Sequence, residues 1–323
     1  MEQRRGAGLG LAVLAAAAFG SAGALAASLL EAGWTPSAAV SARLVVAALV
    51  LTPVALVALR RHPASLRGGA RMLTIYGVVA VAGAQIAFFN AVQHLSVAIA
   101  LLLEYSGTLL VVAWFWLMRS ERPRALTIAG AVVAILGLAL VLDVGGAGEI
   151  NVEGVLWAFA AAVGLATYFV LSADTDDALP PFVVAWGGLV IGGVTVLAAG
   201  LIGLVPLEAP RTAVVLLGTE MSWLVPVLGL SLVAGAVAYV SGITAARVLG
   251  ARVASFVGLT EVLFAVLFAW LLLDQELTVP QGVGFVLVLT GIALVRIDEP
   301  TVAAVVPERV SDEPVLAGRP GLL

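Results

Sequence analysis

The sequence predicts an all-α polytopic membrane protein: ten transmembrane helices in an inverted repeat of two five-helix halves, with both termini in the cytoplasm. Three observations lead to this fold class: the composition, the apolar segments and the distribution of arginine. Of the 323 residues, 62% are hydrophobic and 11% are charged, with a mean hydropathy of +1.14. A soluble domain carries about 45–50% apolar and about 25% charged residues. The bilayer is therefore the solvent that suits this chain.

The composition also excludes several kinds of site. The chain has no cysteine, so it cannot form a disulfide framework, a thiolate metal site or a thiol nucleophile. Its two histidines, His62 and His94, fall at predicted helix ends and cannot make a multi-histidine metal site. No basic cluster points to nucleic acid. We therefore expect no metal, no cofactor and no nucleic-acid partner.

Ten segments come close to the roughly 20 mostly apolar residues that a spanning helix needs. Short connections rich in turn-forming or charged residues separate most of them. The longest connection, 205–220, contains an apolar stretch at 214–217 that is too short to span, and we expect it to lie in the membrane interface. The predicted spans are 7–30, 36–59, 71–92, 95–118, 124–142, 154–173, 181–204, 221–243, 251–273 and 280–296.

The two ends of the chain need separate interpretation. Arg4 and Arg5 precede the first apolar run, which contains Ala24-Leu25-Ala26 and so also resembles a cleavable signal peptide. An uncleaved first helix is favoured, because the run is long enough to span and completes the first half. Residues 298–323 carry acids and prolines without helical periodicity, and they predict a disordered cytoplasmic tail.

Arginine sets the predicted orientation. With the N-terminus inside, 14 of the 16 basic residues lie on the cytoplasmic side, Arg211 lies outside and Arg43 lies within a span. Cytoplasmic loops carry the excess of basic residues in membrane proteins. The bias predicts that both termini lie in the cytoplasm, and therefore a cell (plasma or inner) membrane protein.

The sequence also shows signs of an internal repeat. If the two halves are homologous, the odd number of helices in each places them upside down relative to each other. Thr35-Pro36 pairs with Pro180-Pro181, and Leu103-Glu104 pairs with Thr260-Glu261. Chance similarity of apolar segments is the alternative, and the paired glutamates weigh against it. The predicted units are residues 1–145, residues 146–297 and the tail 298–323.

Three ionisable side chains fall inside predicted spans: Arg43, Glu104 and Glu261. Each costs roughly 2.5–3.5 kcal/mol at a helix centre. Glu104 and Glu261 enter from opposite sides and both reach a depth of roughly 14 Å, near the middle of a core about 30 Å thick. Carboxyls at this depth can take up and release protons, as pumps and antiporters require.

Each of these residues also has a structural interpretation. Either glutamate can be a protonated hydrogen-bonding clamp between helices. Arg43 can snorkel to the outer surface, pair with Glu104 or bind a substrate carboxylate, and snorkelling or structural pairing is favoured. Neutral polar side chains lie deep as well, and each is either a contact along the pathway or a hydrogen bond between helices. They include Gln85, Asn90, Tyr105, Tyr168, Tyr239 and Thr260.

The sequence resembles the EamA family of the drug/metabolite transporter superfamily over residues 7–297. Its third and fourth predicted helices are similar to those of threonine/homoserine exporters, with an aromatic-rich helix followed by the step Leu103-Glu104-Tyr105. Two departures concern helix kinks: Val262 and Thr108 stand where the family often has proline and a Gly-Pro step. The segments that carry the resemblance are 76–91, 98–107, 249–256, 259–262 and 271–276.

The resemblance implies a ten-helix carrier with inverted repeats, a central cavity and export of metabolites or amino acids. The function we expect is a secondary transporter, not an enzyme, that exports small metabolites by alternating access, with Glu104 and Glu261 on the path. Its expected partners are a small-molecule substrate and the lipid bilayer, with protons and a second copy of the chain as further candidates. Import or facilitated diffusion is the alternative, and a non-transporting membrane scaffold is a weaker one.

Overall fold

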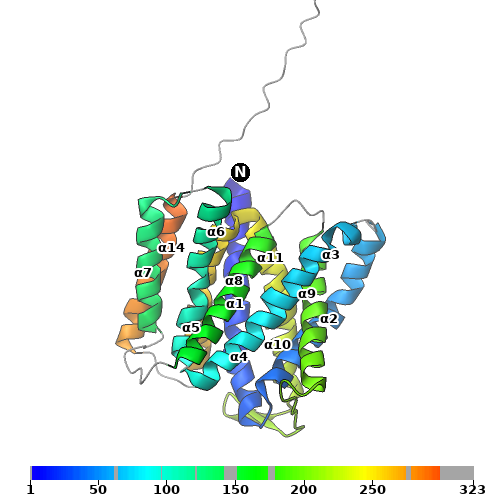
Figure 1. The fold of residues 1–323 in the computed structure, drawn as a ribbon. Helices are drawn as coiled ribbons and strands as arrows, with labels where there is room; N and C mark the ends of the chain where they lie inside the picture. Colours follow the sequence, from blue (N-terminus) through cyan, green and yellow to red (C-terminus); the bar gives the residue numbers. More distant parts are fainter. Residues whose placement is uncertain are drawn as a thin grey trace, which may run out of the picture.

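The computed structural model describes residues 2–61, 65–95, 97–120, 122–141, 151–173, 179–273 and 278–298. The described chain is a bundle of roughly antiparallel helices with one small β-hairpin (Figure 1). Eight of its helical stretches are long and apolar enough to cross a membrane, and two shorter apolar helices, Ala125–Leu140 and Val279–Val295, stand where the fifth and tenth spans are predicted. The prediction of a polytopic helical membrane protein is confirmed.

Chain order places the described elements as follows. The first half holds α1 (Glu2–Glu31), α2 (Pro36–Arg61), α3 (Ser65–Ile75), η1 (Tyr76–Gly83), α4 (Ala84–His94), α5 (Val97–Tyr105), α6 (Gly107–Arg119) and α7 (Ala125–Val141). The second half holds α8 (Val152–Ala173), α9 (Pro181–Leu201), β1 (Val214–Leu216), β2 (Thr219–Met221), α10 (Leu224–Ser231), η3 (Leu232–Val237), α11 (Ala238–Leu249), α12 (Ala251–Gly258), α13 (Thr260–Leu273) and α14 (Val279–Asp298). Of the predicted disordered tail 298–323, the structure describes only Asp298, which ends α14 as a helical residue; the rest lies outside the described residues.

Four of the predicted helices are less regular than the sequence indicated. The third and eighth each contain a π-helical segment, η1 and η3. The fourth is interrupted at Ser106 and the ninth at Leu259. Hydroxyl side chains bond backbone carbonyls at both interruptions: Thr108 donates to Tyr105 O at 3.0 Å and Thr260 to Val257 O at 2.7 Å. Such local bonds compete with the regular helix and bend it.

The helices pack in pairs that bring distant parts of the sequence together. Helix α1 lies against α11 and α13, and α8 lies against α4, α5 and α6. At one edge of the molecule α7 packs along α14, and at the opposite edge α2 packs along α9 (Figure 1). A Cβ at Gly130 would lie 2.8 Å from Gly291 O, so the backbones of α7 and α14 nearly touch there. Glycine permits such close approach between membrane helices.

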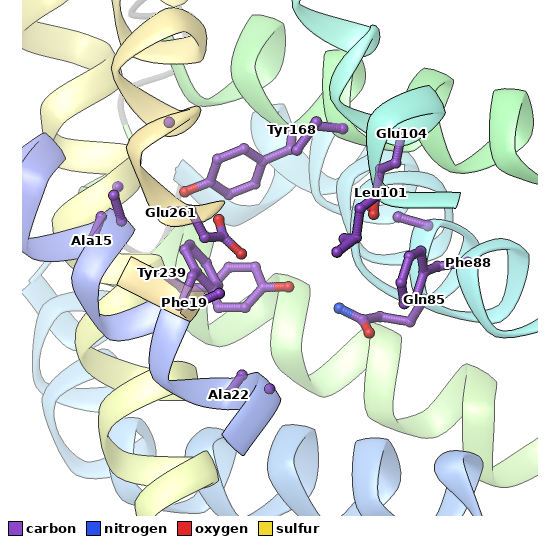
Figure 2. Close-up of a pocket in the computed structure, with 18 of the residues that line it drawn as sticks. Ala15, Phe19, Ala22, Gln85, Phe88, Leu101, Glu104, Tyr168, Tyr239 and Glu261 are labelled. Atoms are coloured by element: carbon purple, nitrogen blue, oxygen red, sulfur yellow. The ribbon is translucent and has the colours of Figure 1, made fainter. Parts of the chain in front are cut away.

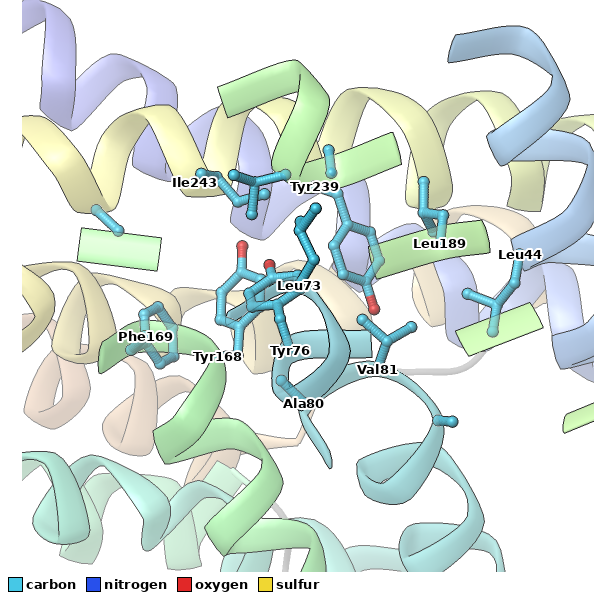
Figure 3. Close-up of a cluster of buried hydrophobic side chains, with 14 of the residues drawn as sticks. Leu44, Leu73, Tyr76, Ala80, Val81, Tyr168, Phe169, Leu189, Tyr239 and Ile243 are labelled. Carbon is cyan, nitrogen blue, oxygen red and sulfur yellow. The ribbon is translucent and has the colours of Figure 1, made fainter. Parts of the chain in front are cut away.

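The largest buried cluster lies where α8, α11 and η1 meet. Tyr76, Tyr168 and Tyr239 are at its centre, together with Leu73 and Ile243 (Figure 3). The ring centroids of Tyr168 lie 5.9 Å from those of both Tyr76 and Tyr239. This cluster forms one wall of the cavity described below.

The connection between α9 and α10 is ordered by contacts with the turn between α1 and α2. Strands β1 and β2 form an antiparallel hairpin whose turn residues, Leu217 and Gly218, both have positive φ. Trp34 Nε1 donates to Pro210 O at 2.8 Å, and Thr35 Oγ1 donates to Pro206 O at 2.9 Å. The apolar stretch 214–217, expected only to lie in the interface, thus supplies the first strand of this hairpin and half of its turn.

Candidate functional site

A cavity of about 320 Å³ lies between the helices that the two interruptions bend. Its lining reaches from Ala12 to Leu30 along α1, so it extends along most of that helix. Other walls come from α2, η1, α4, α5, α8, α10, α11, α12 and α13. The volume is at the lower end of the range for small-molecule pockets, about 300–1,000 Å³. A metabolite with few heavy atoms matches this space.

The two glutamates lie on facing walls of the cavity. Glu104 is the penultimate residue of α5, and Glu261 is the second residue of α13. Figure 2 shows the Glu261 carboxyl directed across the cavity, with Glu104 on the opposite wall beside Leu101. Their charges are close enough to act on each other, and the Tyr105 side chain is within hydrogen-bonding reach of Glu261. The cavity therefore offers two acidic groups that can bind a cation or exchange protons.

Arg43 supplies a positive charge to the same cavity. Its side chain is only 8% exposed and lines the cavity from α2. Nη2 donates to Ala234 O in η3 at 2.7 Å, and the guanidinium carbon lies 5.6 Å from the ring centroid of Phe19. The guanidinium does not extend to the surface, and within the described part of the chain it makes no ion pair with Glu104. Its electrostatic influence is instead on Glu261.

Aromatic rings cover the side of the cavity next to Arg43. Phe19 packs edge-to-face on Tyr239 at 5.1 Å and on Tyr168 at 6.2 Å between ring centroids. The Tyr168 hydroxyl is buried and has no hydrogen-bond partner among the described residues. An apolar ligand would find an aromatic wall here with one polar tip.

The structure brings seven of the nine predicted site residues into contact with this cavity and leaves two outside its lining. Asn90 donates instead to Ile86 O at 2.8 Å, and Thr260 donates to Val257 O. Sequence reasoning missed Phe19 and Phe88, because a phenylalanine in an apolar helix gives no sign of facing a cavity. The seven are Arg43, Gln85, Glu104, Tyr105, Tyr168, Tyr239 and Glu261.

The described residues contain no group of three or more histidine, aspartate or glutamate side chains that could hold a metal ion. The chemistry of the cavity is therefore that of two carboxyls, one guanidinium, one amide and several phenols in an apolar lining.

Comparison with known proteins agrees with this architecture. The chain is 25% identical over 239 residues to a Salmonella typhimurium (strain LT2) protein described as an uncharacterized inner membrane transporter, YicL; the match covers 72% of this chain and 75% of that protein. A crystal structure shares the fold at a TM-score of 0.68 and 19% identity, covering 88% of this chain and 96% of that one. The model of the EamA-like transporter family matches residues 6–143 and again residues 152–297. This chain, a multi-pass helical protein with two carboxyls and a guanidinium in a cavity between its helices, therefore belongs to the EamA-like transporter family.

Proposed function

We propose that this protein is a secondary transporter that exports small amphipathic metabolites, such as amino acids, by alternating access coupled to protons. The observation that carries the proposal is the pair of carboxyls, Glu104 and Glu261, facing each other across one cavity deep among the helices. Ionisable groups at membrane depth are costly and mark substrate and proton pathways. Membership of a transporter family and a relative in the inner membrane give the setting: a multi-pass cell-membrane carrier.

An inverted repeat supports alternating access, and several contacts fit one. The family model matches each half of the chain separately. In α7 and α14, Gly130 approaches Gly291 O and Gly137 approaches Gly284 O. A shift of 154 residues relates Gly130 to Gly284 and Gly137 to Gly291, so the two contacts join equivalent pairs of positions. The π-helical segments η1 and η3 occupy corresponding places in the third and eighth predicted helices. In transporters with inverted repeats, substrates bind near the midplane between the halves.

Transport in proteoliposomes tests the function directly. An overexpression screen for resistance to toxic metabolite analogues first identifies the substrate class, and a radiolabelled member of that class is then followed with and without a pH gradient. We expect transport that a pH gradient accelerates, and Glu104→Gln or Glu261→Gln should slow it while the protein stays folded. Wild-type rates in both variants contradict the proton coupling, and sensitisation instead of resistance favours import.

Orientation and access to the cavity can be tested on the same protein because it has no native cysteine. Single cysteines at Arg211 and Arg71 are predicted to react with a membrane-impermeant maleimide from outside and inside, respectively. A cysteine at Ala22, which lines the cavity, should become protected when substrate is added. The reverse labelling at Arg211 and Arg71 contradicts the predicted topology.

A further inference from the structure

Arg43 is the basic side chain in the described lining of the cavity, and its surroundings leave much of its hydrogen-bonding capacity unused. A guanidinium carries five N–H donors in a planar fork. One nitrogen, Nη2, bonds Ala234 O, while Nε is buried without any partner in the described structure. No carboxylate of the described residues lies within 4 Å. A buried cation needs a counter-charge in direct contact and a full set of hydrogen bonds. Among the described residues, Glu261 acts on Arg43 only from beyond ion-pair distance, and Nε has no partner.

A purely structural role explains only part of this geometry. The bond to Ala234 O holds α2 against η3, where a π-helical turn changes the normal pairing of carbonyls. A clamp of this kind uses one nitrogen and leaves the guanidinium without a carboxylate in direct contact among the described residues. A second buried donor without a partner, the Tyr168 hydroxyl, borders the same cavity. Both residues lie near the ring of Phe19. The guanidinium carbon of Arg43 is 5.6 Å from the centroid of that ring, and the ring centroid of Tyr168 is 6.2 Å from it.

We infer that Arg43 is the anchor for a carboxylate group of the transported molecule. The planar fork matches a carboxylate in a bidentate geometry, and such charge-assisted pairs are the strong hydrogen bonds of proteins. The aromatic wall of Phe19, Tyr168 and Tyr239 then receives the apolar part of the molecule. Glu261, which lies beside Tyr168 and Tyr239, and Glu104, on the facing wall, then serve an ammonium group or protons (Figure 2).

The inference rests on the proposed function and narrows its substrate to small carboxylates, anionic or zwitterionic, with an apolar body. It also makes the site asymmetric. In the repeat, Gly188 stands at the position that corresponds to Arg43, and it packs against the ring of Tyr76 with no room for a side chain. The carboxylate anchor therefore comes from the first half alone.

Equilibrium binding to the purified, detergent-solubilised protein tests the anchor without requiring transport. The probes are phenylalanine, phenylalaninamide, 3-phenylpropanoate and 3-phenylpropanamide, together with leucine, leucinamide, 4-methylpentanoate and 4-methylpentanamide. We expect the wild-type protein to bind the carboxylates. Arg43→Gln should weaken their binding by about 10- to 100-fold, because a hydrogen bond to a charged group contributes that factor. Binding of the amides should change by less than twofold.

Two further variants separate recognition from folding. Arg43→Lys keeps the charge but not the fork, and should give an intermediate loss for carboxylates. Arg60→Gln, an exposed arginine on the same helix, should change nothing and is the matched control. Thermal unfolding without ligand shows whether each variant is folded. The inference is overturned if Arg43→Gln weakens the binding of acids and amides equally, or if the wild-type protein binds none of the carboxylates.

Transport of the same probes keeps the two proposals apart. If carboxylate binding depends on Arg43 but no probe or metabolite crosses a proteoliposome membrane, the anchor stands and the transporter proposal fails. If metabolites are transported and Arg43→Gln transports carboxylates at the wild-type rate and affinity, the transporter proposal stands and the anchor fails.

Discussion

The two interrupted helices, α5–α6 and α12–α13, differ in where they carry their carboxyl. Both are apolar, both are bent by a short turn, and both face the same cavity. Glu104 comes two residues before the interruption at Ser106, whereas Glu261 comes two residues after the interruption at Leu259. If the interruptions are equivalent in the repeat, the glutamates are offset by four residues, which is about one helical turn.

This offset gives the two carboxyls different backbone environments. Glu261 lies in the first turn of α13, where the helix dipole favours a negative charge. Glu104 lies at the end of α5, where carbonyl groups gather and the dipole opposes a negative charge. Arg43 also acts on Glu261. The comparison predicts that Glu261 is better placed than Glu104 to carry a negative charge.

The largest expected effect comes from removing each carboxyl in turn. Glu261→Gln should lower transport driven by a pH gradient at least tenfold, because it removes the group best placed to be an anion. Glu104→Gln should lower the rate less and keep its dependence on the gradient. Gradient-driven uptake and counterflow at equal pH, measured in the same proteoliposomes, separate the two effects. Equal losses in both variants would show that the offset has no functional meaning.

A second effect concerns the close backbone contacts that hold each interrupted helix. A Cβ at Gly107 would lie 2.6 Å from Ala162 O, and one at Gly20 would lie 2.7 Å from Glu261 O. Gly107→Ala and Gly20→Ala should each lower the free energy of unfolding by about 1–3 kcal/mol, because backbone atoms would have to shift. Tryptophan fluorescence during thermal unfolding measures the loss. Gly23→Ala, with nothing within 4 Å of its Cβ, is the control and should be neutral or slightly stabilising.

The hydroxyls at the interruptions should have smaller effects. Thr108→Val and Thr260→Val each remove one bond to a backbone carbonyl and keep the shape of the side chain. Bonds of this kind in membrane proteins average about 0.6 kcal/mol, so each loss of stability should be about that size. The same unfolding measurement applies. A loss of stability in only one of the two variants would show that the interruptions have different causes.

The smallest effect on transport should come from a site remote from both interruptions. Asp298, the last residue of α14, accepts bonds from Thr127 N at 2.8 Å and Thr127 Oγ1 at 2.6 Å near the start of α7. Asp298→Asn should lower stability by about 0.3–1 kcal/mol, since it removes a negative charge near a helix N-terminus. The transport rate should not change. A marked loss of transport would mean that the α7–α14 pair takes part in the cycle.

Much of the fold was predictable because length and hydropathy follow directly from the bilayer. All ten apolar segments are helical in the structure over most of their length. The interruptions and π-helical segments were not predictable, since neither Ser106 nor Leu259 is a helix breaker by residue type. At the first interruption, one tertiary feature and one local feature coincide: the close approach of a neighbouring backbone at Gly107 and the hydroxyl bond of Thr108.

The candidate site was predictable for charged residues, which stand out in apolar spans. It was not predictable for residues whose position at the cavity depends on how the helices pack. Arg43, Glu104 and Glu261 stand out in apolar spans, and all three line the cavity. Asn90 and Thr260 are also polar, but the side chain of each donates to a backbone carbonyl three or four residues earlier and lies outside the lining. Phe19 lines the cavity without any signal in the sequence. The free donor capacity of Arg43 also required the structure, because it depends on which carbonyls η3 presents.

The tie between the α1–α2 turn and the hairpin connection has a mechanical consequence. Trp34 and Thr35 bond carbonyls of the α9–α10 connection, and Thr212 Oγ1 bonds Ala32 O at 3.2 Å. Four helix ends that are distant in sequence are therefore fastened together at one rim of the bundle. Under the proposed alternating access, these four helix ends would move as one unit, and the cavity would have to open away from this rim.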